Sequence, residues 1–582
     1  MNQLASAWLS IARHSSGRTS WIGRLASVAR DPSYSILTVA VVTTCFLVLY
    51  PAIWLFYGAF VYGHGGLSQA FADFGRLPGL GRAFQNTAFL TLATVPISFV
   101  IALPLAWITS RTDTPLRRII ELAALLPFIM PPLIGAVAWS LLAAPRTGVL
   151  NVVARYLGAT GPVTNIYSMT GLIFVMSLYL SPFVFLTVKP LMDRMGASLE
   201  EASSIAGGGP WRTLVHVVLP LCKPAILSAA ILVFTRALEE FAIPGILGTP
   251  SGIYTVTTYI FYQAISYTPP RYEIAALLAS FIMAATGIAL AIQARLLSGR
   301  QRFTTVSGKG HPPRRLQLGA WRYMTLAYAM LYILLAVILP FSVLIYAAFI
   351  GSWGDAPVVE NLTAAHFTAT FSPELNVTSS VLNSLVLALG GATLAILPTL
   401  LVSIAIVKGR GLASRGLESI TAIPLTMPGP VMAVAMLWAY IHPPFALYGT
   451  LWILLLAYMT HYIPYGVRTI TGSLRQVGDE LERAALVCGA TRARSFRDVI
   501  LPLARSGVLA GWMLMFVSMI RELSASIFLF VPGTETIAVS LVERWQEGDF
   551  SSVAVLSLTL VAVSFAVILI VRRLFGPAPF ER

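Results

Sequence analysis

The sequence predicts an all-α polytopic membrane protein with about 12 transmembrane helices in two parallel six-helix repeats. Composition is the first reason. Of 582 residues, 57% are hydrophobic and only 11% are charged, whereas soluble domains contain about 25% charged residues. A soluble chain of this length would leave much of that apolar surface in water. The number of long apolar stretches and an internal repeat are the second and third reasons.

Twelve apolar stretches are long enough to cross a bilayer core of about 30 Å, which takes roughly 20 helical residues. They cover approximately residues 35–58, 86–109, 119–143, 167–190, 223–247, 273–297, 323–350, 380–406, 417–441, 449–472, 507–531 and 552–574. Because each stretch is continuously apolar, helices are favoured over strands, in which polar and apolar residues would alternate. Pro131 and Pro132, and later Pro428 and Pro430, either kink their helices around a pathway or serve packing alone.

Basic residues predict that both termini are cytoplasmic, because short cytoplasmic loops are enriched in Lys and Arg. The loops assigned to the cytoplasm carry Arg111, Arg117, Arg118, Lys408, Arg410, Arg415, Arg572 and Arg573, whereas the outer loops carry Asp355, Glu360, Glu374, Glu535, Glu543, Glu547 and Asp549. This orientation in lipid explains the net charge of +15. A nucleic-acid partner is therefore not expected.

Two copies of one unit are indicated by residues that recur at a fixed distance. Asn86 recurs as Asn383, and Leu-Pro-Phe-Ile-Met-Pro at 126–131 recurs as Ile-Pro-Leu-Thr-Met-Pro at 423–428, each 297 residues later. Beyond a shorter outer loop near 442–448 the offset becomes 282 residues. An even number of stretches separates the copies, so they are parallel. The predicted divisions are a cytoplasmic N-terminal segment (1–33), a first repeat (34–297), a basic cytoplasmic linker (298–322), a second repeat (323–575) and a cytoplasmic tail (576–582).

One cytoplasmic loop occurs in both copies, as EEASSIAGGGPWRTLVHVVLP at 200–220 and as ERAALVCGATRARSFRDVILP at 482–502. Both versions predict a short helix, a glycine turn in the left-handed region and a short amphipathic segment. A Leu-Pro pair is then expected to interrupt the chain before the next span. Such a helix either caps the bundle at the interface or docks on a cytosolic partner, and its duplication favours docking.

The spacing Glu-Ala-Ala, three residues, Gly, nine residues, hydrophobic-x-Leu-Pro resembles the EAA loop of ABC importer permeases, here as a fused double permease of the type I importer fold. In that family the loop forms a coupling helix on a nucleotide-binding ATPase. The resemblance implies this coupling role for Glu200, Glu201, Ala202, Gly207, Leu219, Pro220, Glu482, Ala484, Ala485, Gly489, Leu501 and Pro502. The first copy reads Glu-Ala-Ser and the second has Arg483 after Glu482, so two ATPase contacts of unequal strength are expected.

The resemblance also implies partners and a location. These are two copies of a cytosolic ABC ATPase, a periplasmic solute-binding protein and membrane lipid, in a bacterial inner membrane. The chain has no GxxxxGK[ST] phosphate loop, so ATP is expected to be used by the partner subunit, with no cofactor on this chain and no enzyme activity of its own.

Ionisable residues in the fifth and eleventh stretches mark a candidate translocation pathway, because charges inside a membrane usually face a pathway or a partner. The candidates are Arg236, Glu239, Glu240, Arg521, Glu522, Ser524 and Ser526. Glu240 and Glu522 occupy equivalent positions in the two repeats. The spacing of Arg236 and Glu240 also allows an internal ion pair, and both interpretations remain open from the residues alone.

The segment Arg-Glu-Leu-Ser-Ala-Ser at 521–526, with Pro-Gly-Thr-Glu-Thr at 532–536, resembles ferric-iron importer permeases. The resemblance implies import of ferric iron. Carboxylates suit hard cations in general, which is compatible with iron and also with polyamines. Thiamine, phosphonate or polyamine import by the same class is the alternative. A gradient-driven secondary transporter would leave the paired docking loop unexplained, and the charges inside the membrane disfavour a membrane scaffold or sensor.

Other reactive residues support no catalytic or metal site. Cys45, Cys222 and Cys488 have no metal-like spacing. His461 is a single buried histidine, of a kind that more often serves packing than ligation. The sequence contains no Ser/His/Asp set and no pair of catalytic carboxylates, so no catalytic residue is assigned.

Overall fold

A computed structural model describes most of the chain, and every extended regular element in the described part is a helix. The described residues are 32–62, 72, 75–195, 202–203, 205–298, 316–354, 359–409, 412–477 and 479–575. The predicted cytoplasmic tail lies outside them, as do nearly all of the predicted N-terminal segment and residues 299–315 of the linker. The predicted all-α fold is confirmed.

The long helices follow the predicted spans. In the first half they are α3 (Pro32–Thr44) with α4 (Tyr50–Tyr57), α6 (Leu80–Arg111), α7 (Arg117–Ile129) with α8 (Pro132–Ala143), α10 (Met169–Arg194), α13 (Leu219–Glu239) and α15 (Tyr272–Ser298). In the second half they are α16 (Trp321–Ile333) with α17 (Leu339–Phe349), α19 (Val377–Leu385) with α20 (Gly391–Lys408), α21 (Leu412–Ala422) with α22 (Gly429–Tyr440), α23 (Leu451–Gln476), α26 (Leu501–Ile520) and α29 (Phe550–Phe575).

Nine helices of the described chain are long and apolar enough to cross a membrane, and the number rises to eleven if each of two bent pairs is one span. The remaining predicted span corresponds to α23, whose His461 and Arg468 make it less apolar. The length of α23, and not its hydropathy alone, therefore identifies it as the counterpart of α10.

The third and ninth predicted spans are bent instead of straight. α7 and α8 meet at 98°, and α21 and α22 meet at 108°. Met130 and Met427 have extended backbones at these bends because each precedes a proline, whose ring disfavours helical geometry in the residue before it. The helices therefore turn at equivalent places in the two repeats.

The sequence predicted that each Leu-Pro pair would interrupt the chain before the next span, but the helix continues through both pairs. η3 (Leu214–Val218) runs into α13, and η12 (Phe496–Ile500) runs into α26, as single π-helical turns. The amide of the residue before the proline bonds to the carbonyl five residues back. Proline has no N–H and clashes with the carbonyl four residues back, so a π-turn accommodates it without ending the helix.

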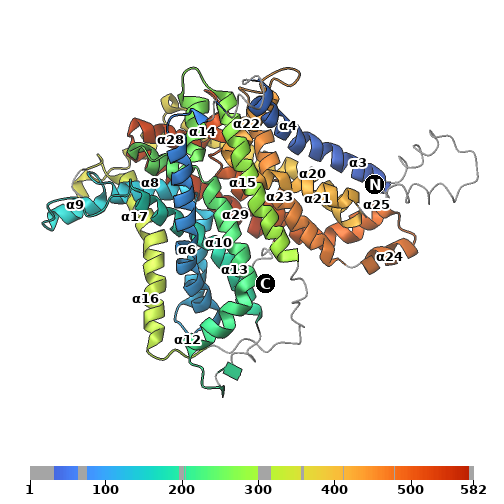
Figure 1. The fold of residues 1–582 in the computed structure, drawn as a ribbon, viewed down its shortest axis with the longest axis horizontal. Coiled ribbons are helices and arrows are strands. Elements are labelled where there is room, and N and C mark those ends of the chain that lie inside the picture. The colour runs from blue at the N-terminus through green and yellow to red at the C-terminus, as the bar shows by residue number, and fades with distance from the viewer. Residues whose placement is uncertain are drawn as a thin grey trace, which may run out of the picture.

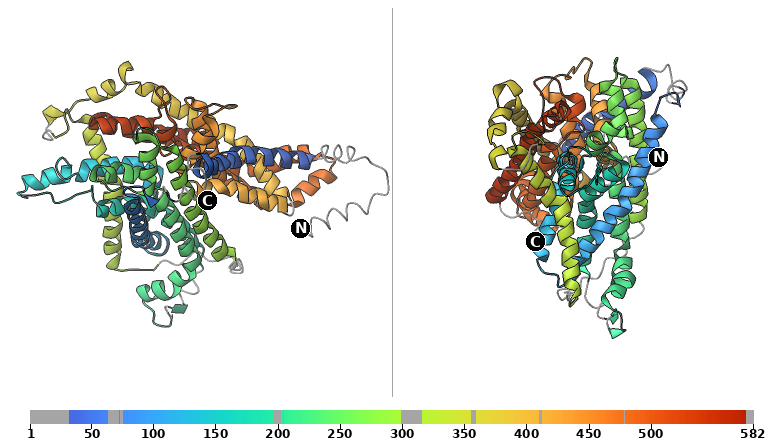
Figure 2. Two further views of the ribbon diagram at one scale, coloured as in Figure 1. Left: turned by 45° about the horizontal axis from the view of Figure 1, so that its top comes forward. Right: turned by 90° about the vertical axis from the view of Figure 1, so that its left-hand side faces the viewer.

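Each half contributes its first span to the other half. α3 packs along α20, α4 packs on α22, and α17 packs on α8 and α29. Small residues allow close approach between membrane helices, and Ala40 and Ala405 are buried in one such contact together with Leu47, Val402 and Ile463. In Figure 1, α6, α13 and α16 run from top to bottom while α20 and α23 run obliquely to the right, and Figure 2 shows α3 beside the second half.

The end of the predicted linker is held at the start of the loop that follows α6. Leu316 donates its N–H to the Arg111 carbonyl at 2.8 Å, and Asp113 donates its N–H to the Leu316 carbonyl at 3.2 Å. The Leu318 N–H then bonds to the Asp113 carboxylate at 3.0 Å. The linker therefore begins the second half at the same end of the bundle as the 111–118 loop.

Candidate functional site

The duplicated loop has the same backbone turn in both copies. Gly207 and Gly489 both adopt positive φ, at 79° and 88°. In the first copy the Gly208 N–H bonds to the Ser203 carbonyl at 2.8 Å, and in the second the Ala490 N–H bonds to the Ala485 carbonyl at 3.0 Å. This six-to-one bond around a left-handed glycine is the Schellman helix ending. The predicted glycine turn is confirmed.

An apolar side chain projects at the same point of each turn. Ile205 is 88% exposed, and its equivalent Val487, 282 residues later, is 87% exposed. Both stand two residues before the glycine, at the end of the short helix. In the second copy this helix is α24 (Asp479–Val487), which Figure 1 shows at the edge of the molecule. The two loops therefore present similar apolar tips.

The charges around the two turns differ. Glu482 of α24 pairs with Lys408 at the end of α20, whereas Arg494 and Arg497 on the following segment are exposed. Glu200 and Glu201 lie outside the described residues. Both exposed arginines pair with Asp498, and residues 479–502 contain four arginines and four acidic residues. The second copy therefore carries mixed charge beside its apolar tip.

The remaining coupling residues lie on either side of the turns. Ala202 and Ala484 are exposed, and each accepts a bond from an amide at the end of its helix. Leu219 and Pro220 begin α13, as Leu501 and Pro502 begin α26. The loop is thus joined rigidly to the fifth and eleventh spans.

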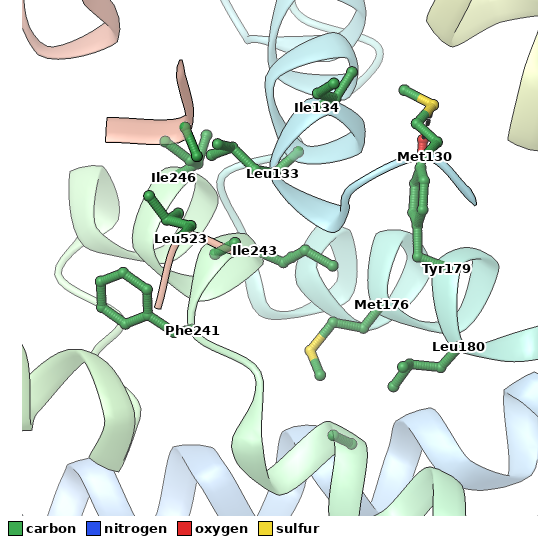
Figure 3. Close-up of a cluster of buried hydrophobic side chains, with 14 of the residues drawn as sticks. Met130, Leu133, Ile134, Met176, Tyr179, Leu180, Phe241, Ile243, Ile246 and Leu523 are labelled. Carbon is green, nitrogen blue, oxygen red and sulfur yellow. Dashed lines mark hydrogen bonds between the residues drawn. The ribbon is translucent and has the colours of Figure 1, made fainter. Parts of the chain in front are cut away.

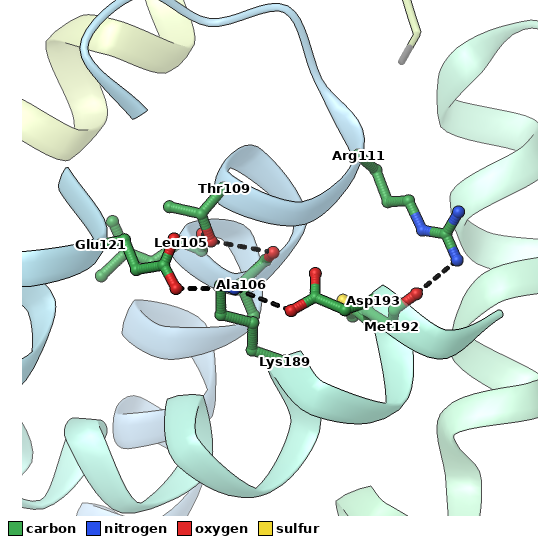
Figure 4. A network of polar contacts seen from close by, with 8 residues as sticks. All are labelled: Leu105, Ala106, Thr109, Arg111, Glu121, Lys189, Met192 and Asp193. Atoms are coloured by element: carbon green, nitrogen blue, oxygen red, sulfur yellow. Dashed lines mark hydrogen bonds and ion pairs between the residues drawn. The ribbon is translucent and has the colours of Figure 1, made fainter. Parts of the chain in front are cut away.

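Ionic contacts fix the helix that leads into the first coupling segment (Figure 4). Lys189 on α10 lies 2.8 Å from Glu121 on α7 and 2.7 Å from Asp193. The fully buried Arg111 at the end of α6 donates to the carbonyls of Met192 and Met195 at the end of α10. The ends of three helices are thereby held together where the coupling segment begins.

The second half also holds the ends of its helices together, but through different contacts. Arg475 on α23 lies 3.6 Å from Glu418 on α21, and Glu418 is the repeat equivalent of Glu121. Lys408 is the repeat equivalent of Arg111, yet it holds the coupling helix itself through Glu482. The two coupling segments are therefore anchored differently.

Glu240 and Glu522 have matching positions at the points where their spans end. The Glu240 carboxylate accepts the Ala242 N–H at 3.0 Å, and the Glu522 carboxylate accepts the Ala525 N–H at 2.8 Å. Glu522 is 8% exposed and also accepts a bond from the Tyr462 hydroxyl. Each glutamate therefore closes the turn that follows its helix.

Two arginines connect the halves close to these glutamates. Arg236 of the first half bonds to the Tyr465 hydroxyl of the second, and its guanidinium also lies near the Phe183 ring. Arg521 of the second half donates to the Phe128 carbonyl of the first. Phe183 and Tyr465 are equivalent in the two repeats, so Arg236 lies between matching positions of α10 and α23.

Arg236 also forms an ion pair, although not with the residue expected from the sequence. Its partner is Glu239, at 3.3 Å, and not Glu240, whose carboxylate turns back towards the amides of its own loop. The candidate pathway residues of the two spans therefore form one polar cluster between the halves.

Polar residues of α23 extend this cluster. Tyr458, Tyr462 and Tyr465 follow one face of the helix, and the Tyr458 hydroxyl lies 2.5 Å from the Ser526 hydroxyl. His461 lies beside Tyr462 with its ring edge-on at 4.7 Å. Ser524 packs against Gly429, where an added Cβ would come within 2.3 Å of the Ser524 Cβ, so only glycine fits.

An apolar seal, made of Leu133, Phe241, Ile243, Ile246, Leu523 and Phe528, lies next to the polar cluster. In Figure 3 Leu523 of the second half points among Leu133, Ile243 and Ile246 of the first. Phe528 also contacts Phe241, with ring centroids 6.1 Å apart. Each of these side chains is at most 6% exposed, so the halves are in close contact here.

A hollow of 220 Å³ lies along α23, within the second half. Its lining includes Arg468, Thr471 and Arg475 of α23 and Glu418 of α21. Arg468 is one turn beyond Tyr465, which bonds to Arg236. The charged hollow therefore begins one turn of α23 away from the polar cluster.

The described residues contain no group of three or more His, Cys, Asp or Glu side chains that could hold a metal ion. The three glutamates of the cluster, of which Glu522 is buried and Glu239 and Glu240 are partly buried, are engaged by amides, an arginine or a tyrosine. The chemistry of the cluster is that of a closed contact between halves.

Comparison with known proteins decides the family. The model of the family "Binding-protein-dependent transport system inner membrane component" matches residues 94–303 and 402–576. The chain belongs to this family. Each match covers the larger, later part of one repeat and includes one copy of the duplicated loop. The protein is therefore a multi-pass membrane protein, the fused permease of an ABC importer.

Individual relatives agree with this assignment. The ferric transport system permease protein FbpB of Actinobacillus pleuropneumoniae is 23% identical over 90% of this chain and 75% of its own length. The probable ABC transporter permease protein y4fN of Sinorhizobium fredii is 24% identical over 88% of this chain and 91% of its own. The sulfate transport system permease protein CysW of Escherichia coli K12 is 25% identical over 35% of this chain and 68% of its own.

Several site residues escaped the sequence reasoning. Four residues that join the halves or anchor the coupling segments were not predicted as site residues, namely Tyr465, Phe128, Lys408 and Lys189. The repeat offsets would have drawn attention to two of them, because Tyr465 is equivalent to Phe183 and Lys408 to Arg111. The repeat offsets do not say which residues are in contact, because the contacts depend on the bends between α7 and α8 and between α21 and α22.

Proposed function

We propose that this permease imports ferric iron from a periplasmic solute-binding protein into the cytoplasm by alternating access. The observation that carries the choice of iron is similarity to the ferric transport permease of Actinobacillus pleuropneumoniae over 90% of the chain. Both termini are then cytoplasmic, in a bacterial inner membrane. ATP is hydrolysed by two copies of a cytosolic ABC ATPase, and this chain binds no cofactor.

The paired turns are the proposed ATPase contacts. Each presents an exposed apolar side chain, Ile205 or Val487, at the end of a short helix. The glycine turn joins that helix to a segment that runs into a membrane span through a π-turn, so a docked ATPase subunit would move that span through the turn. The second copy carries both arginines and acidic residues, and its ATPase contact is expected to differ in charge from that of the first copy.

The glycine turns provide the test of this coupling. Replacing Gly207 and Gly489 with valine forces a branched side chain into positive φ, which costs about 1–2 kcal/mol at each turn. Binding of the purified ATPase should therefore weaken roughly 5- to 30-fold. Gly416, on the cytoplasmic helix α21 with open space around it and ordinary backbone geometry, is the matched control. Unchanged binding in the double variant would refute the coupling role.

Transport in this scheme requires the contacts between the halves to break. The apolar seal closes the outer side, while the hollow beside Arg468 lies on the cytoplasmic side. Opening outwards would separate Leu523 from Ile246 and break the Arg236–Tyr465 and Arg521–Phe128 bonds. The buried glutamates released by this change would then face the ion.

Glutamine substitutions at Glu240 and Glu522 test the path. Glutamine keeps an oxygen for the amides of Ala242 and Ala525 but removes the negative charge. Uptake of radiolabelled iron should fall at least about tenfold in the double variant, since loss of a charged partner costs more than about 1.5 kcal/mol. Uptake equal to that of the unaltered chain would remove these residues from the pathway.

An oxyanion such as a phosphonate is the second candidate substrate. Arg468 and Arg475 line the cytoplasmic hollow, and arginine suits phosphate-like oxygens. Competition by phosphonate or sulfate in the same uptake assay distinguishes the two, and thiamine or a polyamine can be added to the same series. Uptake that proceeds without the ATPase would instead indicate a gradient-driven transporter.

A further inference from the structure

A groove outside the pathway lies where the first span of the second half packs against the first half. Its volume is 400 Å³. The wall combines α8, α10 and α17 with the outer arm, which is the loop 144–168 that contains α9 (Val149–Tyr156). The lining residues include Trp139, Leu150, Thr164, Phe174, Leu335 and Leu339. The loop equivalent to the outer arm in the second half is shorter, so only the first half supplies an arm of this length.

The groove borders the lipid-facing side of its helices. Leu335 and Leu339 line it, while Leu334 and Ile338, their neighbours along the chain, are 39% and 45% exposed. Leu331, one turn earlier, is 53% exposed. Exposed leucine and isoleucine on a spanning helix contact acyl chains. An acyl chain can therefore enter the groove from the bilayer.

Two aromatic rings form part of the groove wall. Trp139, which is 4% exposed, and Phe174 both line the groove, and their rings meet edge-on with centroids 4.7 Å apart. The Trp139 Nε1–H is buried away from the groove surface, so an occupant would contact the indole ring and not its N–H. With Leu150, Leu335 and Leu339 these rings make the wall mainly apolar.

The outer arm is held firmly over this groove. Asn151 is 1% exposed and forms four hydrogen bonds, to the Ala144 carbonyl, the Thr164 carbonyl and the amides of Val163 and Thr164, all between 2.8 and 2.9 Å. The Asn151 side chain thus joins the beginning of the outer arm to its end. α9 projects from the bundle in Figure 1.

The charge of the outer arm favours an anionic headgroup. Residues 141–170 contain Arg146 and Arg155 but no aspartate or glutamate. Both arginines are exposed, and the Arg155 guanidinium bonds to the Arg146 carbonyl at 2.8 Å. Tyr156, which is 77% exposed, is typical of residues at the level of lipid headgroups.

We propose that the groove binds one anionic phospholipid of the outer leaflet, bridging the two halves. Its acyl chain lies along Leu335, Leu339 and Phe174. Its headgroup lies beside Arg146 and Arg155. The lipid would fill the groove between the first span of the second half and the first half. This contact has to stay intact while the transporter opens outwards.

Native mass spectrometry of the purified permease–ATPase complex, released from nanodiscs that contain phosphatidylglycerol and phosphatidylethanolamine, tests the proposal. Tryptophan at both Leu335 and Leu339 fills the groove and should lower retained phosphatidylglycerol at least about fivefold. Tryptophan at Leu331 and Leu334 enlarges the lipid-facing surface of the same helix and should leave retention unchanged.

Glutamine at Arg146 and Arg155 tests the headgroup separately. Preference for phosphatidylglycerol over phosphatidylethanolamine should fall by about fivefold for each arginine. Equal lipid retention in the groove-filling and lipid-facing variants, both with unchanged melting curves, would overturn the proposal. Loss of solute-binding-protein association in the arginine variants, with lipid retention unaltered, would also overturn it and would assign the outer arm to that protein.

Discussion

At the scale of single residues, the sequence predicted the importance of buried charges but not their partners. Arg236, Glu239, Glu240, Arg521 and Glu522 do lie together between the halves. The i, i+4 spacing suggested a pair between Arg236 and Glu240, but the span ends at Glu239. Glu240 therefore lies one residue beyond the helix, and the helical geometry that would bring it next to Arg236 is lost.

Removing Arg236 should destabilise the protein because Glu239 would keep a buried charge without its partner. Arg236→Gln is expected to cost about 1–3 kcal/mol and to lower the melting temperature of the detergent-solubilised protein. Adding Glu239→Gln should restore most of the loss. Arg415→Gln, at an exposed position of α21, is the control. A double variant as unstable as the single one would show that the ion pair is not the stabilising contact.

The apolar tips of the two turns should be direct ATPase contacts. Ile205→Ser and Val487→Ser each remove a side chain that is almost wholly exposed, so neither should change the melting temperature. Burial of such a side chain at an interface contributes about 1.5–3 kcal/mol, and ATPase affinity should fall about tenfold or more. Gly416→Ser serves as the control in the same binding assay. ATPase affinity that stays the same in both variants would place the contact elsewhere on the loop.

At the scale of elements, sequence patterns predicted helix existence well and helix continuity poorly. The glycine turn followed from the repeated motif, because positive φ strongly favours glycine. The Leu-Pro pair looked like a break, yet a π-turn carries the helix through it. At Pro131 and Pro428 the opposite happens, and the predicted straight spans bend. The presence of a proline alone therefore does not decide between the two outcomes.

The contact between Lys408 and Glu482 should hold the second coupling helix against α20. In Lys408→Gln, amide hydrogen exchange in residues 479–487 is expected to accelerate, since local opening loses an anchoring charge. Arg415→Gln, at a nearby exposed site, should leave exchange unchanged. Equal protection of α24 in both variants would mean that apolar packing alone anchors the helix.

At the scale of the whole molecule, the two repeats were predictable from the offsets of 297 and 282 residues, whereas their exchange of first spans was not. α3 packs on α20 and α17 packs on α8. An apolar span carries no signal for which half it will contact, because lipid and helix surfaces are equally apolar. The predicted divisions at 34–297 and 323–575 therefore describe the sequence repeats and not separate bodies in space.

The apolar seal should have to open during each transport cycle. A disulfide between cysteines placed at Ile246 and Leu523, in a chain whose three native cysteines are replaced by serine, should hold the halves together. Iron uptake is expected to stop on oxidation and to return on reduction. Uptake that continues in the fully cross-linked protein would show that the seal is not a gate.

The most direct test of the central claim is ATP-dependent accumulation of radiolabelled iron in proteoliposomes that contain this permease, its ATPase and an iron-loaded binding protein. Accumulation should require ATP and the ATPase, and should fall about tenfold or more in the Gly207→Val, Gly489→Val double variant, while Gly416→Val retains it. Accumulation that persists without the ATPase, or that is unchanged in the double variant, would contradict the account in which two glycine-turn coupling helices drive one pathway.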